Sequence, residues 1–457
     1  MVFSSIMFLF IFLPTLIIYY AVPFKFKNFI IIILSLIFYS WGEPRYFFIM
    51  IFSIIIDFIL AIIIENNRKN LLLCKLMVVV SIVFNIGLLF FFKYYNFFID
   101  NINFVFGTNL ENINLTLPLG ISFFVFQTLS YTIDIYRNKV AAERNLINFA
   151  AFVVLFPQLI AGPIVRYTDI NEGLKYRTIT FLNIQDGIRM FILGLAKKVL
   201  IANNIGALWT TVESIGFSRI SSPLAWLSIM SFGLQIYFDF SGYSFMAIGL
   251  GKMLGFEFPP NFNYPYISRS VTEFWRRWHM TLGLWFKEYL YIPLGGSRCS
   301  KAKMCLNLFI VWFVTGFWHG ANWNFILWGL FFFVFLIIEK FGLNKFLEKY
   351  KILSHLYLLV VVLIGWTLFA IIETAQLKTF FIKLFSFNLG IDWVYYLRNY
   401  SVIFILGIIF STPILNGFYK KITKNIYLDT LVSMVLLILC IAYLVDASYN
   451  PFLYFRF

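Results

Sequence analysis

Two histidines lie in the stretches of this chain whose residue types are best suited to chemistry. His279 stands in WRRWHMTLGLWFKEYLYIPLGG, and His319 stands further on in FWHGANW. Because imidazole has a pKa near ~6.5, it can take a proton from a hydroxyl at neutral pH and return it to a leaving thiolate. Acyl transfer from a thioester requires that proton movement. The chain has three histidines, and we interpret the third, His355 beside a basic loop, as a surface residue.

The sequence around His319 predicts a closely packed helix pair. Gly316 and Gly320 form a GxxxG spacing, which allows two helices to approach closely. Trp318 and Asn322 lie on either side of His319 and are candidate substrate-binding residues. An ionisable side chain at membrane depth is costly to keep, so it is a functional candidate. The alternative is a packing histidine that bonds a neighbouring carbonyl.

The sequence around His279 predicts a helix with a basic stripe. Ser270 and Glu273 form a capping box, so the helix is expected to begin at Val271. Arg276 and Lys287 could hold the phosphates of a donor that arrives from the cytoplasm. The alternative is an interfacial anchor whose cations meet lipid headgroups. At about 100° per residue, one face carries Trp278, Leu282, Trp285 and Tyr289, and the opposite face carries Thr272, Arg276, His279, Gly283 and Lys287.

A carboxylate also lies inside a long apolar segment. Asp239 recurs with Gln235 and Tyr243 every four residues along one helical face. It is therefore expected to face a partner or a water-filled cavity, and it is a candidate for orienting a histidine. The alternative is that Asp239 bonds nearby backbone, or caps a helix that breaks at Gly242.

Composition determines which elements must position these side chains. The 457 residues are 61% hydrophobic and 12% charged, with a mean hydropathy of +0.85. This composition predicts an all-α polytopic membrane protein. The net charge of +15 comes from Lys and Arg in short clusters between apolar runs, which is typical of topology-setting loops and implies no nucleic-acid partner. The four cysteines are scattered, so neither a disulfide framework nor a metal site is predicted.

Apolar runs divide the chain into candidate spans. The N-terminal run lacks a basic n-region and a cleavage site, so it is interpreted as a retained first helix. The middle of the chain, residues 161–221, is too irregular for its orientation to be assigned. No internal repeat is visible, and one domain over 1–457 is predicted. The candidate spans are 3–22, 28–41, 46–64, 72–92, 115–136, 147–162, 188–204, 222–250, 303–318, 320–340, 354–372, 400–415 and 427–446.

The positive charges in short loops predict the orientation of the chain. Lys and Arg cluster after the first, third and fifth candidate spans, whereas 97–115 carries two acidic residues and no basic one. Because cytoplasmic loops are enriched in Lys and Arg, both termini are expected outside, including the C-terminal tail DASYNPFLYFRF. On this topology His279 lies toward the cytoplasm, and His319 lies toward the membrane interior or its outer half.

Several long motifs resemble the membrane-bound O-acyltransferase (MBOAT) family, and in particular its bacterial alginate O-acetylation branch. The resemblance extends from the first span to the terminal PFLYFRF. The motifs are PLGISFFVFQTLSYTIDIYR, FPQLIAGPI, QIYFDFSGYSFMAIGLGKMLGF, NFNYPYISRSVTEFWRRWHMTLGLWFKEYLYIPLGG and WHGANWNFILWG.

The resemblance implies a multi-helix fold around a central tunnel, with re-entrant or interfacial helices, in a bacterial cell membrane. It implies that His319, in WHGA, is catalytic and that His279 is the second family histidine. Members of this branch take an acyl group, typically acetyl from acetyl-CoA, at the cytoplasmic side. They pass it outward to an extracytoplasmic polysaccharide, often through a separate acyltransferase partner. No bound cofactor is expected.

Two alternative functions remain open at this point. One is D-alanyl transfer to teichoic acid from a carrier-protein thioester. The other is a transporter or lipid flippase, in which Asp239 and the histidines would relay protons or bind substrate. Transporters usually contain repeated halves, and no such repeat is visible in this sequence.

Overall fold

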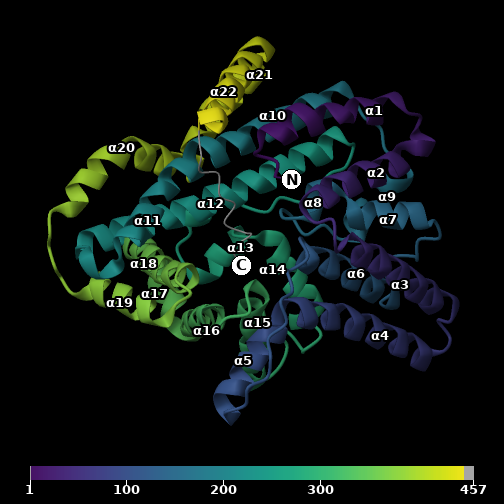
Figure 1. Ribbon diagram of the computed structural model, residues 1–457, viewed down its shortest axis with the longest axis horizontal. Coiled ribbons are helices and arrows are strands. Elements are labelled where there is room, and N and C mark those ends of the chain that lie inside the picture. Colours follow the sequence, from purple (N-terminus) through teal and green to yellow (C-terminus); the bar gives the residue numbers. More distant parts are fainter. Residues whose placement is uncertain (1, 447–457) are drawn as a thin grey trace. The chain divides into compact units, whose positions relative to one another are not determined.

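The computed structural model describes residues 2–446, and every regular element in this range is a helix (Figure 1). The predicted all-α fold class is therefore confirmed. The predicted outside location of the C-terminal tail concerns residues 446–457, and all of these after Asp446 lie outside the described range.

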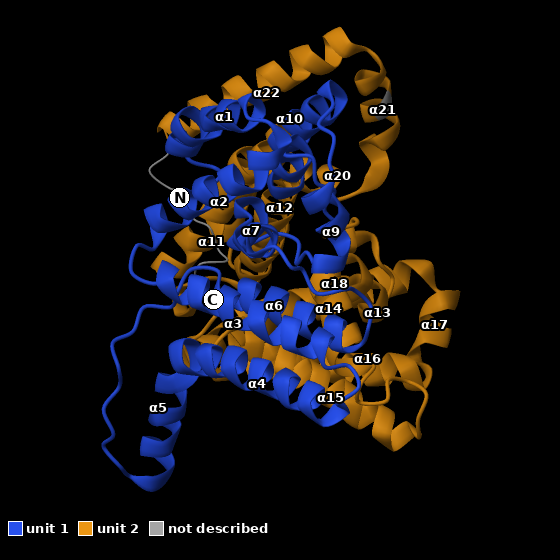
Figure 2. Cartoon of the chain, turned by 90° about the vertical axis from the view of Figure 1, so that its right-hand side faces the viewer, with its two compact units in different colours: residues 1–191, 246–259 blue, residues 192–245, 260–457 orange. Residues whose placement is uncertain are grey.

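The chain forms two compact units, which Figure 2 colours separately. Unit 1 comprises residues 1–191 and 246–259, and unit 2 comprises 192–245 and 260–457. The helices that begin in unit 1 are α1 (Leu16–Ala21), α2 (Phe24–Gly42), α3 (Phe47–Asn66), α4 (Leu71–Leu89), α5 (Tyr95–Phe106), α6 (Ile121–Tyr136), α7 (Leu146–Val154), α8 (Phe156–Leu159), α9 (Tyr167–Lys175) and α10 (Phe181–Ala196).

The helices that begin in unit 2 include the segments in which the sequence places its candidate chemistry. They are α11 (Asn203–Ile215), α12 (Ser222–Met253), α13 (Val271–Arg277), α14 (Met280–Phe286), α15 (Lys301–His319), α16 (Trp323–Ile338), α17 (Asn344–Lys349), α18 (Lys351–Ala370), α19 (Thr374–Phe385), α20 (Asp392–Phe410), α21 (Asn416–Lys424) and α22 (Ile426–Asp446).

Nine helical segments among the described residues are long and apolar enough to cross a membrane. This confirms a multi-pass membrane protein. They are Phe24–Gly42, Phe47–Asn66, Leu71–Phe106, Phe181–Ile215, Lys301–His319, Trp323–Lys349, Lys351–Ala370, Asp392–Phe410 and Ile426–Asp446.

Several predicted spans have no helix of crossing length. The run 115–136 folds into α6, which has 16 residues, and the run 147–162 breaks at Leu155 between α7 and α8. The first predicted span, 3–22, yields only a short apolar helical segment, Phe8–Ala21. Apolar composition alone overestimated these spans because buried helices inside a helical protein are as apolar as membrane-crossing ones.

A buried polar network links three helices of unit 1. The Asp57 carboxylate on α3 accepts hydrogen bonds from Ser81 and, at 2.8 Å, from the Asn85 amide on α4. Thr132 on α6 donates to the same carboxylate at 3.2 Å, and Thr128 donates to the Asn85 side-chain oxygen at 2.9 Å. Such bonds satisfy the buried polar groups and fix how the three helices pack.

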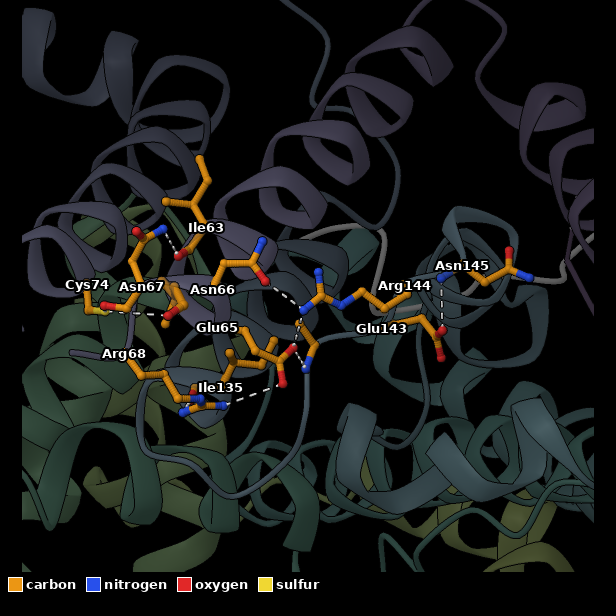
Figure 3. A network of polar contacts seen from close by, with 12 residues as sticks. Ile63, Glu65, Asn66, Asn67, Arg68, Cys74, Ile135, Glu143, Arg144 and Asn145 are labelled. Carbon is orange, nitrogen blue, oxygen red and sulfur yellow. Dashed lines mark hydrogen bonds and ion pairs between the residues drawn. The ribbon is translucent and has the colours of Figure 1, made fainter. Parts of the chain in front are cut away.

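Two basic loops of unit 1 contact each other (Figure 3). Arg144 donates to the Asn66 side chain at 2.7 Å and lies 3.7 Å from the Glu65 carboxylate. Arg68 donates to the carbonyl of Ile135 at 3.2 Å. The positive-charge rule assigns the loops after α3 and α6 to the same side of the membrane, and these contacts agree with that pairing.

Candidate active site

His319 is the last residue of α15, and α15 pairs closely with α16. A Cβ at Gly316 would overlap the carbonyl of Phe325 and approach the Cα of Gly329 at 3.3 Å. A Cβ at Gly320 would overlap the Phe325 ring. The close helix approach predicted from the GxxxG spacing is therefore present, because glycines on α15 and α16 leave room for direct backbone contact.

Aromatic rings surround the half-buried His319 imidazole. Its ring centroid lies 5.1 Å from that of Trp318, 5.0 Å from that of Trp328 on α16, and 5.3 Å from that of Phe369 on α18. The Trp328 and Phe369 rings are both nearly perpendicular to the imidazole. This surround limits the access of water to the imidazole, and a proton acceptor in such a site is poorly hydrated.

The predicted helix start at Val271 is confirmed. The Ser270 hydroxyl accepts the N–H of Glu273 at 3.1 Å, as the capping box requires. The Glu273 carboxylate accepts the N–H of Arg269 at 2.9 Å, one residue earlier than in an ideal box.

The prediction of one continuous helix through His279 is wrong. Helix α13 ends at Arg277, α14 begins at Met280, and His279 between them has a left-handed backbone with φ of +42°. The basic stripe of Thr272, Arg276, His279, Gly283 and Lys287 therefore does not form one helical face. All four residues of the predicted apolar face are buried: Trp278, Leu282, Trp285 and Tyr289.

Backbone hydrogen bonds from a preceding loop produce this break. The N–H of Met280 donates to the carbonyl of Asn261 at 2.9 Å, and the N–H of Asn263 donates to the carbonyl of Arg277 at 3.0 Å. These two bonds satisfy backbone groups at the end of α13 and the start of α14. Sequence periodicity did not predict the break, because its cause is a contact with residues outside the helix.

The start of α13 is held by a buried carboxylate. Glu339, which directly follows α16, accepts the N–H of Val271 at 2.6 Å and the N–H of Thr272 at 2.8 Å. The Thr272 hydroxyl and the Tyr357 hydroxyl donate to the same carboxylate at 2.6 and 3.1 Å. A negative charge is favourable at a helix N-terminus. No sequence pattern predicted this contact of Glu339 with the start of α13.

His279 is buried, with 3% of its surface exposed. Its Nδ1 lies 3.0 Å from the side-chain oxygen of Asn261, and its ring packs edge-on against Phe240 at 4.7 Å. Burial lowers the pKa of His279 to about 3, so the imidazole is neutral across the physiological pH range.

Trp318 brings the two histidines into one neighbourhood. Its ring lies 6.4 Å from that of His279 and 5.1 Å from that of His319. Residues 40 positions apart in the sequence are thus assembled by α13, α14 and α15.

Asp239 lies in a buried ion pair with Lys198, at 2.6 Å. Helix α12 runs through Gly242 without a break, so the suggested broken helix there is wrong. A Cβ at Gly242 would instead crowd the carbonyl of Gly194 at 2.7 Å. Lys198 lies in a π-helical segment, Lys197–Ala202, within the predicted span 188–204.

The remaining predicted site residues make no hydrogen bond or ring contact with either histidine within the described structure. Arg276 and Lys287 are exposed, on opposite sides of the break, and their side chains form no ion pair with a described residue. Asn322 is half-buried and precedes the first residue of α16. His355 is half-buried rather than fully exposed, and its Nδ1 lies 3.0 Å from the carbonyl of Ser268.

No metal ligand set is present among the described residues. No three or more His, Cys, Asp or Glu side chains within residues 2–446 come together in a way that could hold a metal ion.

Comparison with known proteins identifies the family. Residues 136–375 match the model of the membrane-bound O-acyltransferase family. The chain is 37% identical over 399 residues to "Probable alginate O-acetylase AlgI" of Azotobacter vinelandii, covering 86% of this chain and 79% of the relative. It is 36% identical over 366 residues to "Peptidoglycan O-acetyltransferase" of Helicobacter pylori, covering 72% and 68%.

A more distant relative carries a different name. "Teichoic acid D-alanyltransferase" of Streptococcus thermophilus is 30% identical over 247 residues, covering 50% of this chain and 58% of the relative. The matched range 136–375 includes both His279 and His319 and exceeds half of the chain. This chain belongs to the membrane-bound O-acyltransferase family and is an O-acyltransferase.

Proposed function

We propose that this enzyme takes an acetyl group from acetyl-CoA at the cytoplasmic face of the membrane and passes it outward for attachment to hydroxyls of an extracytoplasmic polysaccharide. The names of the relatives that cover most of the chain support this choice, since they are O-acetylases or O-acetyltransferases of alginate and peptidoglycan. A separate extracytoplasmic acyltransferase is the expected partner that completes the attachment.

The contact of Trp318 with both histidines is the observation that carries the proposal. In the transfer step, the oxygen of the acceptor hydroxyl attacks the thioester carbonyl carbon. The His319 imidazole takes the hydroxyl proton as the new ester bond forms, and the proton then goes to the sulfur as the carbon–sulfur bond breaks. The rings around His319 support this role, because they keep bulk water away from the thioester.

Donor binding is assigned to Arg276 and Lys287. Both side chains are exposed, and neither forms an ion pair with a carboxylate of the described residues. Neither charge is therefore neutralised within the described structure. A cation free of an internal partner is available for phosphate groups such as those of coenzyme A. Asn322 and Trp318, on either side of His319, are proposed to contact the acyl group or its acceptor.

D-alanyl transfer from a carrier-protein thioester is the second candidate. It is favoured by the Streptococcus thermophilus relative, which is named for teichoic acid D-alanylation. The chemistry at the histidines would be the same, because both donors are thioesters. The two candidates differ in the donor that the exposed cations would meet.

The test supplies purified protein in proteoliposomes with radiolabelled acetyl-CoA or a labelled D-alanyl carrier protein, and follows thioester loss. Wild-type protein should consume acetyl-CoA, and consumption of only the carrier-bound donor would favour the second candidate. His319→Ala should lower kcat by about 10²- to 10⁴-fold, the usual contribution of a general base. His355→Ala is the matched control. Wild-type rates in His319→Ala would overturn the assignment.

A further inference from the structure

Asn261 makes four side-chain contacts beside His279. Its Oδ1 accepts the hydroxyl of Thr281 at 2.9 Å and the backbone N–H of Thr281 at 3.4 Å. The same oxygen lies 3.0 Å from His279 Nδ1. On the other side, Asn261 Nδ2 donates to the Ser244 hydroxyl at 3.0 Å. Every polar atom of this buried amide is therefore used.

These contacts determine which ring nitrogen of His279 carries the proton. A backbone N–H can only donate, so the Asn261 atom that faces Thr281 must be the amide oxygen. An oxygen at that position accepts hydrogen bonds, so His279 Nδ1 must donate one. In a neutral imidazole only one nitrogen carries hydrogen, which leaves His279 Nε2 unprotonated, with a lone pair that can accept a hydrogen bond.

That lone pair has no partner within the described part of the chain. His279 Nε2 is buried and accepts no hydrogen bond there. Buried polar atoms are nearly always satisfied, so an orphaned acceptor beside Trp318 indicates that a ligand group occupies this place during the reaction.

The backbone at His279 supports the same conclusion. Its left-handed conformation is uncommon for a residue with a side chain and persists only when its surroundings hold it. Asn261 contributes to that hold twice, through its side chain and through its carbonyl, which accepts the N–H of Met280. Such strain concentrates at functional sites.

We propose that Asn261 is a positioning residue: it fixes His279 as the Nδ1–H tautomer and leaves the Nε2 lone pair to accept a hydrogen bond from a donor group of the bound substrate beside Trp318, while His319 remains the base that takes the acceptor's proton. The role of that lone pair in transfer rests on the function proposed above, whereas the tautomer itself does not. Asn261 lies on the loop before α13 and touches no reacting atom.

The tautomer can be read directly by NMR, because the chain has only three histidines. Protein grown with ring-¹⁵N histidine is reconstituted in nanodiscs, and His279→Asn assigns the His279 signals. Wild type should show a protonated Nδ1 and an unprotonated Nε2 throughout pH 5 to 8. A protonated Nε2 in wild type would overturn the inference, whatever the activity of the enzyme.

The pH dependence of transfer in Asn261→Asp is a second readout, and it would not change if the role of Asn261 were only structural. A carboxylate beside Nδ1 favours the imidazolium and raises the pKa of His279. The aromatic rings that pack against the imidazole are Phe240 and Trp318, its Nδ1 faces Asn261, and none of these three side chains carries a charge. In Asn261→Asp, the rate of transfer should therefore fall below neutral pH as His279 becomes protonated. In wild type, His279 should cause no such decrease.

Asn261→Ala should lower kcat about 10²-fold with little change in the donor KM, because it releases the ring but leaves the donor site alone. Asn263→Ala is the matched control, since Asn263 is exposed and bonds Arg277 through its backbone N–H and carbonyl, which the substitution keeps. If NMR shows the expected tautomer but Asn261→Ala and Asn261→Asp both transfer like wild type, the positioning role is refuted. Loss of transfer in His319→Ala would then still support the proposed function.

Discussion

Lys198 and Asp239 form an ion pair in which each side chain is only 3% exposed. Removing one partner of a buried ion pair costs about 3–5 kcal/mol, because the remaining buried charge loses its closest opposite charge. Asp239→Asn should therefore lower the thermal unfolding midpoint in detergent strongly. The double variant Lys198→Met with Asp239→Leu should recover most of that loss, because it removes both charges.

The same double variant tests whether Asp239 also orients a histidine. If its function is structural, the stabilised double variant should retain acyl transfer. A folded double variant that has lost transfer would instead support the orienting role that the sequence suggested. Equal melting of Asp239→Asn and wild type would contradict the buried ion pair.

Glu339 should be important for the stability of the segment that carries His279. Glu339→Gln removes one of the two oxygens that accept the N–H groups at the start of α13, which costs about 1–3 kcal/mol. The expected result is a lower melting temperature together with reduced transfer. Glu348→Gln, at an exposed carboxylate on α17, is the control. Similar melting temperatures of the two variants would argue against a stabilising role for the hydrogen bonds between Glu339 and the start of α13.

Donor binding and chemistry should separate by mutation. Arg276→Gln or Lys287→Gln should raise the donor KM about tenfold to a hundredfold with little change in kcat, because a charge-assisted contact is worth roughly 1.5–3 kcal/mol. Donor titrations in nanodiscs measure this, with Lys345→Gln as an exposed control. If both variants keep the wild-type KM, the cations are better explained by contact with lipid headgroups.

Topology can be tested by thiol labelling in a background without Cys74, Cys299, Cys305 and Cys440. Asn109→Cys should react with an impermeant reagent from outside, and Lys139→Cys should not. Asn67→Cys should behave like Lys139→Cys, since the loops after α3 and α6 contact each other. Reversed labelling would invert the proposed direction of transfer.

Stability should depend on pH through His279. Its folded pKa of about 3 lies below the usual value of 6.5, so the unfolded chain binds more protons between these values. The contribution of the neutral His279 side chain to folding stability is fully present above about pH 6.5, and it is lost as the pH falls toward 3. At pH 5 the difference of 1.5 units corresponds to about 2 kcal/mol. Melting curves should show a smaller acid loss in His279→Asn than in wild type.

The sequence predicted the helical class, the start of α13 at Val271 and the close approach at Gly316, because each depends on local pattern. The residue types around His279 and His319 marked them as candidates, and the structure shows that both contact Trp318. The family resemblance implied their catalytic roles. The sequence pattern alone left His319 open to a packing role and the helix of His279 open to a role as an interfacial anchor.

The sequence did not predict the residues that act through distant contacts. Asn261, Glu339 and Lys198 are recognisable only once the loops and helices that they join lie side by side. A helical period of 3.6 residues likewise continues through Trp278 and His279, although hydrogen bonds from another loop end the helix there. Pattern reports on local preference, and tertiary contacts override it.

The left-handed backbone at position 279 affects how any replacement there should be judged. Asparagine and glycine tolerate this region, whereas alanine meets a steric penalty of about 1–2 kcal/mol. An alanine scan would thus mix the loss of the imidazole with a distorted junction between α13 and α14, and would exaggerate the chemical importance of the histidine. Asparagine isolates the missing ring, because it keeps a side chain that can adopt the same main-chain geometry.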